Sequence, residues 1–183
     1  MRHKTLQAIA DALAERKIAT FRYNFPYSER GTSRNSTAVC VETIRNAVKA
    51  AHKAAPDLPL LAGGHSFGGR MTTTSQSGKP LENVKGLVLF SFPLHMPGRP
   101  DTKRAEHLLN IKIPMLFLTG SRDEFANLDL FKPIVKKLGK KATLHLLDTA
   151  NHSYKVLKKT RKSDEDVFAE MASVAADWAA TLF

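Results

Sequence analysis

With 183 residues, 43% of them hydrophobic, the chain is long enough to form a soluble globular domain without disulfides, and its single cysteine, Cys40, suits a reducing compartment. Its apolar runs are shorter than the roughly 18 residues that span a bilayer, and its first residues lack the apolar centre of a secretory signal, so we expect a cytoplasmic protein with no membrane partner. The formal charge of +11 raises the alternative of nucleic-acid binding, but the basic residues follow no zinc-finger, KH or RRM pattern, and we expect a solvated basic surface with no specific nucleic-acid partner.

The spacing of apolar residues predicts helices and strands in regular alternation. In chain order these are a helix at 4–16, a strand at 18–25 that Pro26 ends, a helix at 38–55, a strand at 58–62 that Gly63 and Gly64 end, a helix at 67–74, a strand at 86–92, a short helix at 103–109, a strand at 113–119, a helix at 130–138, a strand at 142–147 and a helix at 164–183. Continuously apolar strands that alternate with helices indicate a mainly parallel sheet covered on both faces. We therefore predict one α/β domain over residues 1–183, a three-layer α/β/α sandwich of about five strands.

The segment Gly64-His65-Ser66-Phe67-Gly68 has the pattern G-x-S-x-G between a predicted strand and a predicted helix. A sharp strand-to-helix turn at this point lifts a serine hydroxyl above the carboxyl edge of the sheet, which is the arrangement of a nucleophile elbow. The pattern alone is also compatible with a plain glycine-rich connection. Its position favours Ser66 as a nucleophile.

A serine nucleophile needs a base that takes its proton and a carboxylate that orients the base. Asp123 follows the predicted strand at 113–119, and His152 follows the one at 142–147, so both lie at the same edge as Ser66. Each could be a surface loop residue, and Glu124 or Asp148 could compete as the acid. The order Ser, Asp, His on successive loops predicts a triad, with His152 within hydrogen-bond reach of Ser66 and Asp123.

Two further histidines are candidates for the pocket. His65 precedes the nucleophile and is expected to line the elbow, while His95 follows a predicted strand at the same edge and has a structural or a substrate-contacting role. The chain has no HExxH or CxxC spacing, so we predict neither a metal nor a cofactor.

Five stretches together resemble small bacterial α/β-hydrolases of the dienelactone-hydrolase-like type, in the branch shared with a subunit of a eukaryotic histone-acetyltransferase complex. They are the sequences FRYNFPY at 21–27, GGHSFGGR at 63–70, FPLHMPGRP at 92–100, LTGSRD at 118–123 and HS at 152–153. The resemblance implies a serine hydrolase that acts on a carboxylic ester or a similar acyl bond of a small molecule.

The resemblance also implies a strand and a His-Gly-x-Gly-type loop ahead of the first helix, and this loop supplies one N–H of the oxyanion hole. Met1 stands where such a loop would end. The implied strand would lie between those predicted at 18–25 and 58–62. We expect either a late start relative to the family or direct pairing of these two strands, with another chain in the slot as the alternative, and we expect weak activity.

Two functions from different classes follow. In the first, Ser66 attacks an acyl carbon, His152 is general base and then acid, Asp123 orients His152, and the backbone N–H of Phe67 forms half of the oxyanion hole. In the second, the domain is a catalytically feeble interaction module with a basic surface. A homo-oligomer is compatible with both.

Overall fold

The computed structural model describes residues 3–183, so Met1 and Arg2 lie outside the described residues. Its centre is a four-stranded, all-parallel sheet in the order β1-β2-β3-β4. The strands are β1 (Leu60–His65), β2 (Val84–Phe90), β3 (Met115–Gly120) and β4 (Ala142–Leu147). The helices are α1 (Lys4–Glu15), α2 (Pro26–Arg30), α3 (Thr37–Ala54), α4 (Phe67–Gly78), α5 (Leu128–Leu138) and α6 (Val167–Ala180), with 3₁₀ turns η1 (Lys103–Asn110) and η2 (Gly139–Lys141).

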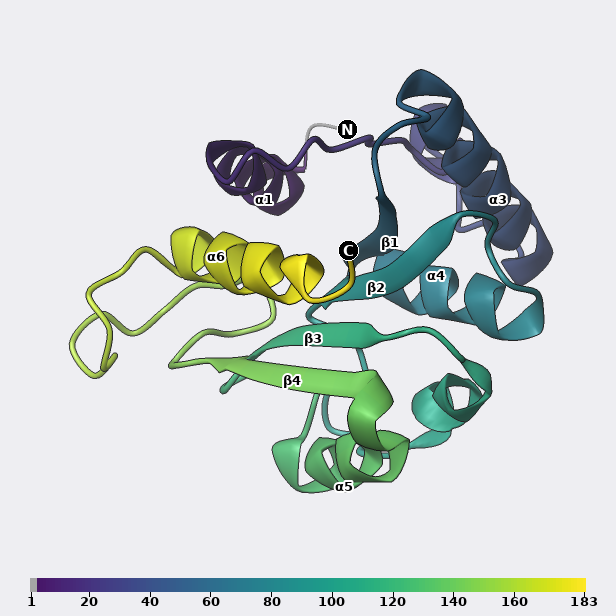
Figure 1. Ribbon diagram of the computed structural model, residues 1–183. Coiled ribbons are helices and arrows are strands. Elements are labelled where there is room, and N and C mark those ends of the chain that lie inside the picture. The colour runs from purple at the N-terminus through teal and green to yellow at the C-terminus, as the bar shows by residue number, and fades with distance from the viewer. Residues whose placement is uncertain (1–2) are drawn as a thin grey trace.

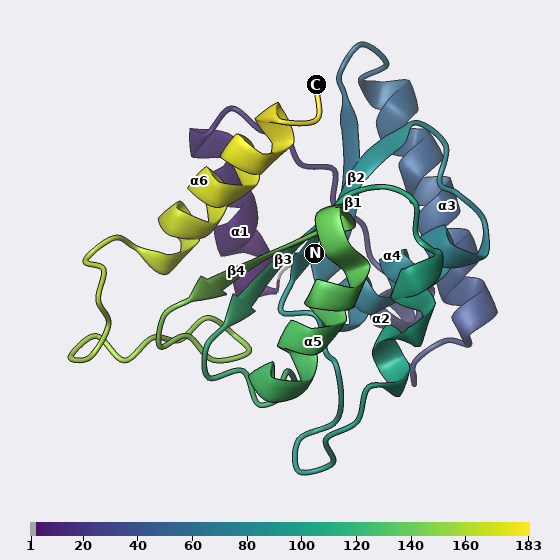
Figure 2. The ribbon, with the colours of Figure 1, turned by 60° about the horizontal axis from the view of Figure 1, so that its bottom comes forward.

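Helices cover both faces of the sheet, which confirms the predicted α/β/α sandwich (Figure 1). Alternate residues of β2 divide between two cores: Leu87 and Leu89 pack with α3, α4, η1 and α5, whereas Val88 and Phe90 pack with α1 and α6. β3 divides in the same way, and all six of its residues are buried. Figure 2 shows α1 and α6 side by side on one face, with α3, α4 and α5 on the other. A strand buried on both faces is largely apolar, as residues 115–118 of β3 are.

Side-chain caps fix where three of the helices begin. Ser36 accepts the N–H of Val39 at the start of α3, Asn127 accepts that of Asp129 at the start of α5, and Asp166 accepts that of Phe168 at the start of α6. Each cap satisfies an N–H that the first helical turn leaves without a partner. Asp166 explains why the last helix starts three residues later than predicted.

The prediction of a strand at 18–25 is wrong, and so is its pairing with the strand at 58–62. Residues 18–25 have no strand pairing, and the sheet has four strands. This segment leads from α1 on one face of the sheet to α3 on the other: Ile18 packs against the core on the first face and Phe25 against the core on the second, beside Tyr27 and Phe67. An apolar alternation makes a strand only where a neighbour can pair with its backbone.

β1 is consequently an edge strand, and all six of its residues are only half-buried. Gly63 and Gly64 lie inside it, which corrects the prediction that they end it. The remaining elements were predicted within a few residues, except that 103–110 forms a 3₁₀ helix and that the short helix α2 follows directly after residues 18–25. Among residues 3–183, no helix combines the length and the apolar character needed to cross a bilayer.

Candidate active site

Ser66 forms a strained turn between β1 and α4. Its φ of 52° and ψ of −117° place a non-glycine residue in a region that costs about 1–3 kcal/mol, and such strain gathers at functional sites. The Ser66 N–H donates to the Phe90 carbonyl at 2.8 Å, and the Arg70 N–H donates to the Ser66 carbonyl at 3.0 Å. Ser66 occupies the N-cap position of α4, yet its side chain makes no capping hydrogen bond. Its hydroxyl is therefore available for another partner.

Two glycines allow β1 and α4 to cross closely enough to form this turn. A Cβ atom on Gly69 would lie 2.6 Å from the Gly64 carbonyl oxygen, and one on Gly64 would lie 2.9 Å from the backbone of Gly68 and Gly69. By contrast, a Cβ atom on Gly68 would meet nothing within 4 Å. Close packing thus requires glycine at position 64, the first of the motif, and at position 69, just after the motif.

The structure brings Ser66, His152 and Asp123 together at the carboxyl edge of the sheet. His152 Nε2 lies 2.7 Å from Ser66 Oγ, and His152 Nδ1 lies 2.8 and 2.9 Å from the two carboxylate oxygens of Asp123. Both His152 and Asp123 are buried. Since Nδ1 faces an acceptor-only carboxylate, it carries the proton, and Nε2 is left to accept the hydrogen of the Ser66 hydroxyl. This arrangement can deprotonate the serine.

The two competing carboxylates are placed differently. Asp148 accepts the backbone N–H of Lys162 at 2.9 Å, and Glu124 is exposed. The Asp123 side chain is fully buried, where one carboxylate oxygen also accepts the Phe125 N–H at 2.9 Å. This second hydrogen bond holds the carboxylate in place beside His152.

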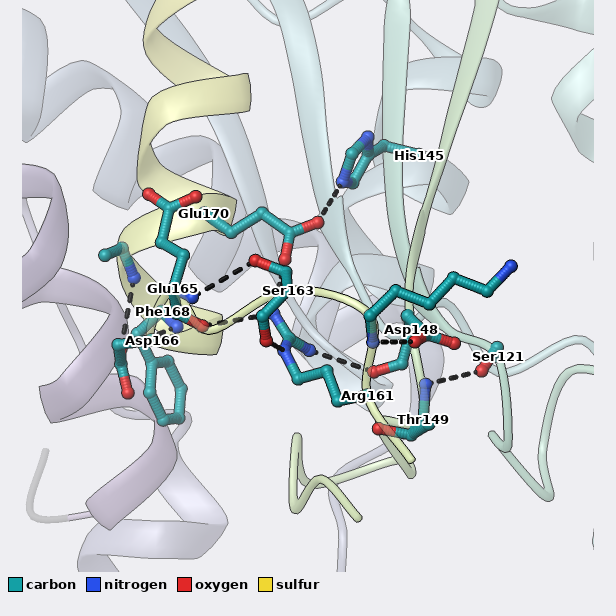
Figure 3. A network of polar contacts seen from close by, with 12 residues as sticks. Ser121, His145, Asp148, Thr149, Arg161, Ser163, Glu165, Asp166, Phe168 and Glu170 are labelled. Carbon is teal, nitrogen blue, oxygen red and sulfur yellow. Dashed lines mark hydrogen bonds and ion pairs between the residues drawn. The ribbon is translucent and has the colours of Figure 1, made fainter. Parts of the chain in front are cut away.

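The loop that carries His152 is fixed to α6 by Arg161. The guanidinium, whose side chain is 4% exposed, donates to the carbonyls of Asp148 and Ser163 at 2.9 and 3.2 Å and pairs with Glu170, which also meets His145 at 2.8 Å (Figure 3). The planar guanidinium can make several such bonds at once, which a lysine cannot. Residues 148–163 are therefore closed into a fixed loop around His152.

His65 lies at the elbow, as expected, and contacts the base. Its Nε2 donates to the His152 carbonyl oxygen at 3.0 Å, and the two ring centroids are 5.3 Å apart. Burial lowers the pKa of His65 to about 4, so its imidazole is neutral at pH 7. The ring of His65 also lies 5.9 Å from the rings of His3 and of Tyr154, centroid to centroid, so the start of α1 lies beside the elbow.

His95 is buried with both ring nitrogens engaged by the backbone. Nε2 accepts the Asn127 N–H at 3.0 Å, so Nδ1 carries the proton and donates to the Met96 carbonyl at 2.9 Å. The His95 N–H also donates to the Phe125 carbonyl at 3.1 Å. Of the two roles expected for His95, these contacts support the structural one, because they fix the loop that carries Asp123.

Sequence reasoning missed two residues of this site. The Phe125 ring lies 4.2 Å from the His152 ring, centroid to centroid, and covers it. Nothing in the sequence near Phe125 singles it out, since its contact depends on the turn after Asp123. Arg161 did offer a signal, because it is the one arginine in the otherwise lysine-based basic run at 155–162.

Comparisons with known proteins agree with this fold. A family model described as an alpha/beta hydrolase domain matches residues 1–180. Similar solved structures include the esterase domain of a Rhodothermus marinus protein (TM-score 0.68, 18% identity, covering 98% of this chain and 81% of that one) and an alpha-beta serine hydrolase homologue from Coxiella burnetii (TM-score 0.69, 17% identity, 97% and 75%). A serine hydrolase without a lid from Xanthomonas campestris is similar to the same degree (TM-score 0.68, 19% identity, 97% and 75%). At these identities the likeness shows a shared fold.

Proposed function

The chain belongs to the α/β-hydrolase domain family, and from this premise we propose that it is a serine hydrolase that cleaves a carboxylic ester or related acyl bond. One observation carries the proposal: His152 bridges Ser66 Oγ at 2.7 Å and the Asp123 carboxylate at 2.8 Å. The similar structures of an esterase domain and of serine hydrolases give it further support.

In the proposed mechanism, Ser66 Oγ attacks the acyl carbon while His152 Nε2 takes the hydroxyl proton. The Asp123 carboxylate holds the Nδ1 proton and stabilises the imidazolium that forms. The N–H of Phe67, the first residue of α4, has no intrahelical acceptor and donates to the developing oxyanion. His152 then gives its proton to the leaving oxygen, and a water molecule, deprotonated by His152, releases the acid and restores Ser66.

We also propose a cytoplasmic location. The single cysteine, Cys40, is buried and free, which suits a reducing compartment.

A fluorophosphonate probe tests the proposal, because it reacts with an activated serine and needs no knowledge of the substrate. We expect Ser66 to be labelled, and Ser66→Ala to abolish both labelling and p-nitrophenyl acetate hydrolysis. The Tm of Ser66→Ala should be unchanged or higher, since the elbow is strained. Ser77→Ala, on the last turn of the same helix, is the control and should retain both activities. Absence of labelling would instead favour the interaction module.

A further inference from the structure

Four cationic side chains gather near the elbow without a carboxylate partner. They are Arg34, Arg70, Lys103 and Arg104, and none of them takes part in an ion pair with residues 3–183. Arg70, Lys103 and Arg104 line a groove of about 350 Å³ between α4, η1 and the start of α3. Thr37, Thr74 and His107 add hydroxyl and imidazole groups to its wall. A groove with cations and hydroxyls is suited to an anion.

The groove begins one helical turn from the nucleophile. Arg70 follows Ser66 by four residues on α4, and its N–H donates to the Ser66 carbonyl. The Arg34 guanidinium lies 4.6 Å and the Arg70 guanidinium 6.0 Å from the centroid of the Phe67 ring. Both arginines are therefore neighbours of the residue whose N–H we assign to the oxyanion hole.

This crowding of cations is unfavourable in the absence of a ligand. Burial, followed by the charges of Arg104 and Arg34, lowers the pKa of Arg70. Burial and the charge of Arg70 also lower the pKa of His107, so that this histidine is neutral at pH 7. An anion between the arginines would relieve the repulsion and accept their hydrogen bonds.

The hydrogen bonds of His107 hold the wall of the groove in place. Thr73 Oγ1 donates to the Arg70 carbonyl at 2.8 Å, so His107 Nε2 must donate to Thr73 Oγ1, also at 2.8 Å. This ties η1 to α4 behind Arg70 and fixes the width of the groove. A volume of about 350 Å³ fits a small ligand rather than a polymer.

We propose that Arg70 and Arg104, with Lys103 and Arg34 at the rim, bind an anionic group of the acyl substrate, a carboxylate or a phosphate, a few atoms from the scissile bond. This proposal rests on the proposed serine hydrolase function and narrows its substrate class to acidic esters. The anionic group stays unchanged in the reaction and serves to place the acyl carbon at Ser66.

Two esters of equal chain length test the proposal. The p-nitrophenyl monoester of glutarate carries a terminal carboxylate, and p-nitrophenyl pentanoate does not. We expect kcat/KM to be about tenfold or more higher for the glutarate ester at low salt, in keeping with the strength of charge-assisted hydrogen bonds. Arg70→Gln, Arg104→Gln and the double variant should lower this ratio, whereas Arg16→Gln, an equal charge change at the end of α1, should not. Inhibition of pentanoate hydrolysis by glutarate and by inorganic phosphate shows which anion the groove prefers.

The outcomes separate this proposal from the proposed function. Ser66-dependent hydrolysis with equal kcat/KM for the two esters would overturn the acidic-substrate assignment and leave the hydrolase standing. If neither ester is cleaved, the proposed hydrolase function fails. Calorimetric titration of Ser66→Ala with glutarate and phosphate then tests whether the groove binds an anion. The anion-binding site is supported if either anion binds and if Arg104→Gln weakens that binding without lowering the Tm of the protein. Binding of neither anion overturns it, as does a single-stranded oligonucleotide that binds more tightly than either through the same arginines.

Discussion

His152 is held through every polar part of its side chain and through its own carbonyl. Asp123 fixes Nδ1, Ser66 faces Nε2, His65 donates to the carbonyl, and the Phe125 ring covers the imidazole. A base that is held this firmly loses little entropy when it reaches the transition state. The tautomer of His152 depends on Asp123, which is the partner of Nδ1.

Asp123→Asn should lower kcat/KM for p-nitrophenyl acetate by a factor on the order of 10³ to 10⁴ with little change in the fold. The asparagine amide can donate to Nδ1, which moves the proton to Nε2 and leaves no acceptor for the Ser66 hydroxyl. Glu124→Gln, one residue away and exposed, is the control. Equal activity losses in the two variants would argue against Asp123 as the acid.

His65→Gln tests the link between His65 and stability at low pH. The pKa of His65 is lowered to about 4 in the folded state, so the stability from neutral His65 is complete above pH 6.5 and is lost as the pH falls toward 4. The difference between the pKa of His65 in the unfolded chain, about 6.5, and in the folded protein, about 4, corresponds to a free energy of unfolding on the order of 3 kcal/mol. A glutamine can still donate to the His152 carbonyl but does not titrate, so urea unfolding at pH 7 and pH 4.5 should differ less in the variant.

His52→Gln, on α3 and remote from the elbow, is the control for this comparison. If His65→Gln lost as much stability as the wild type between the two pH values, the titration of His65 could not be the cause.

The positions of Ser66, Asp123 and His152 were predictable because each follows a strongly apolar strand, and parallel strands end at one edge. The contacts of His95 and Phe125 were not predictable, because they depend on the course of the loops at 91–102 and 121–127. Loop geometry is set by individual hydrogen bonds rather than by a periodic pattern.

At the scale of elements, the sequence misled in two opposite ways: it predicted a strand at 18–25 that does not form, and it ended the next strand before two glycines that do belong to it. The first has the apolar alternation of a strand but no neighbour to pair with, and the second contains two glycines yet pairs with β2 over its whole length. Pairing is a property of the sheet and overrides the local preference of either segment. The helices were easier to predict, because their hydrogen bonds are internal.

Gly69→Ala should destabilise the protein by about 1–3 kcal/mol or more, because its Cβ would lie 2.6 Å from the Gly64 carbonyl oxygen and force β1 and α4 apart. Gly68→Ala is the matched control in the same turn of helix. Its Cβ has open space, so it should stabilise the protein by about 0.5–1 kcal/mol. Urea unfolding measures both, and equal effects would contradict the close crossing of strand and helix.

Arg161→Met should cost about 3–5 kcal/mol of unfolding free energy, because it leaves Glu170 half-buried with the weaker partner His145 and removes the donors of three carbonyls. Activity should fall further than the folded fraction does, since the loop that positions His152 is no longer closed. Lys162→Met, exposed and next in the chain, is the control for charge and should change neither measurement. A stable Arg161→Met enzyme with full activity would show that the loop is held by other contacts.

The whole molecule divides its active site between well covered and poorly covered parts of one sheet. Asp123 follows the inner strand β3, whose residues are all buried. Ser66 and His152 follow the two edge strands, β1 and β4, each of which pairs on one side only. The loop after β4 is tied to α6 by Arg161, whereas β1 is half-buried along its whole length.

An edge position has consequences for how the protein opens. Native-state amide exchange should show that Ala62 and Gly64 in β1 exchange through an opening of lower free energy than Leu89 in β2 or Phe117 in β3, because proteins open first where burial is least. Such an opening would separate the nucleophile from its base while the rest of the sheet persists. Inactivation would then be a local and reversible event that begins several degrees below the Tm, and cooling should restore full turnover without a refolding step.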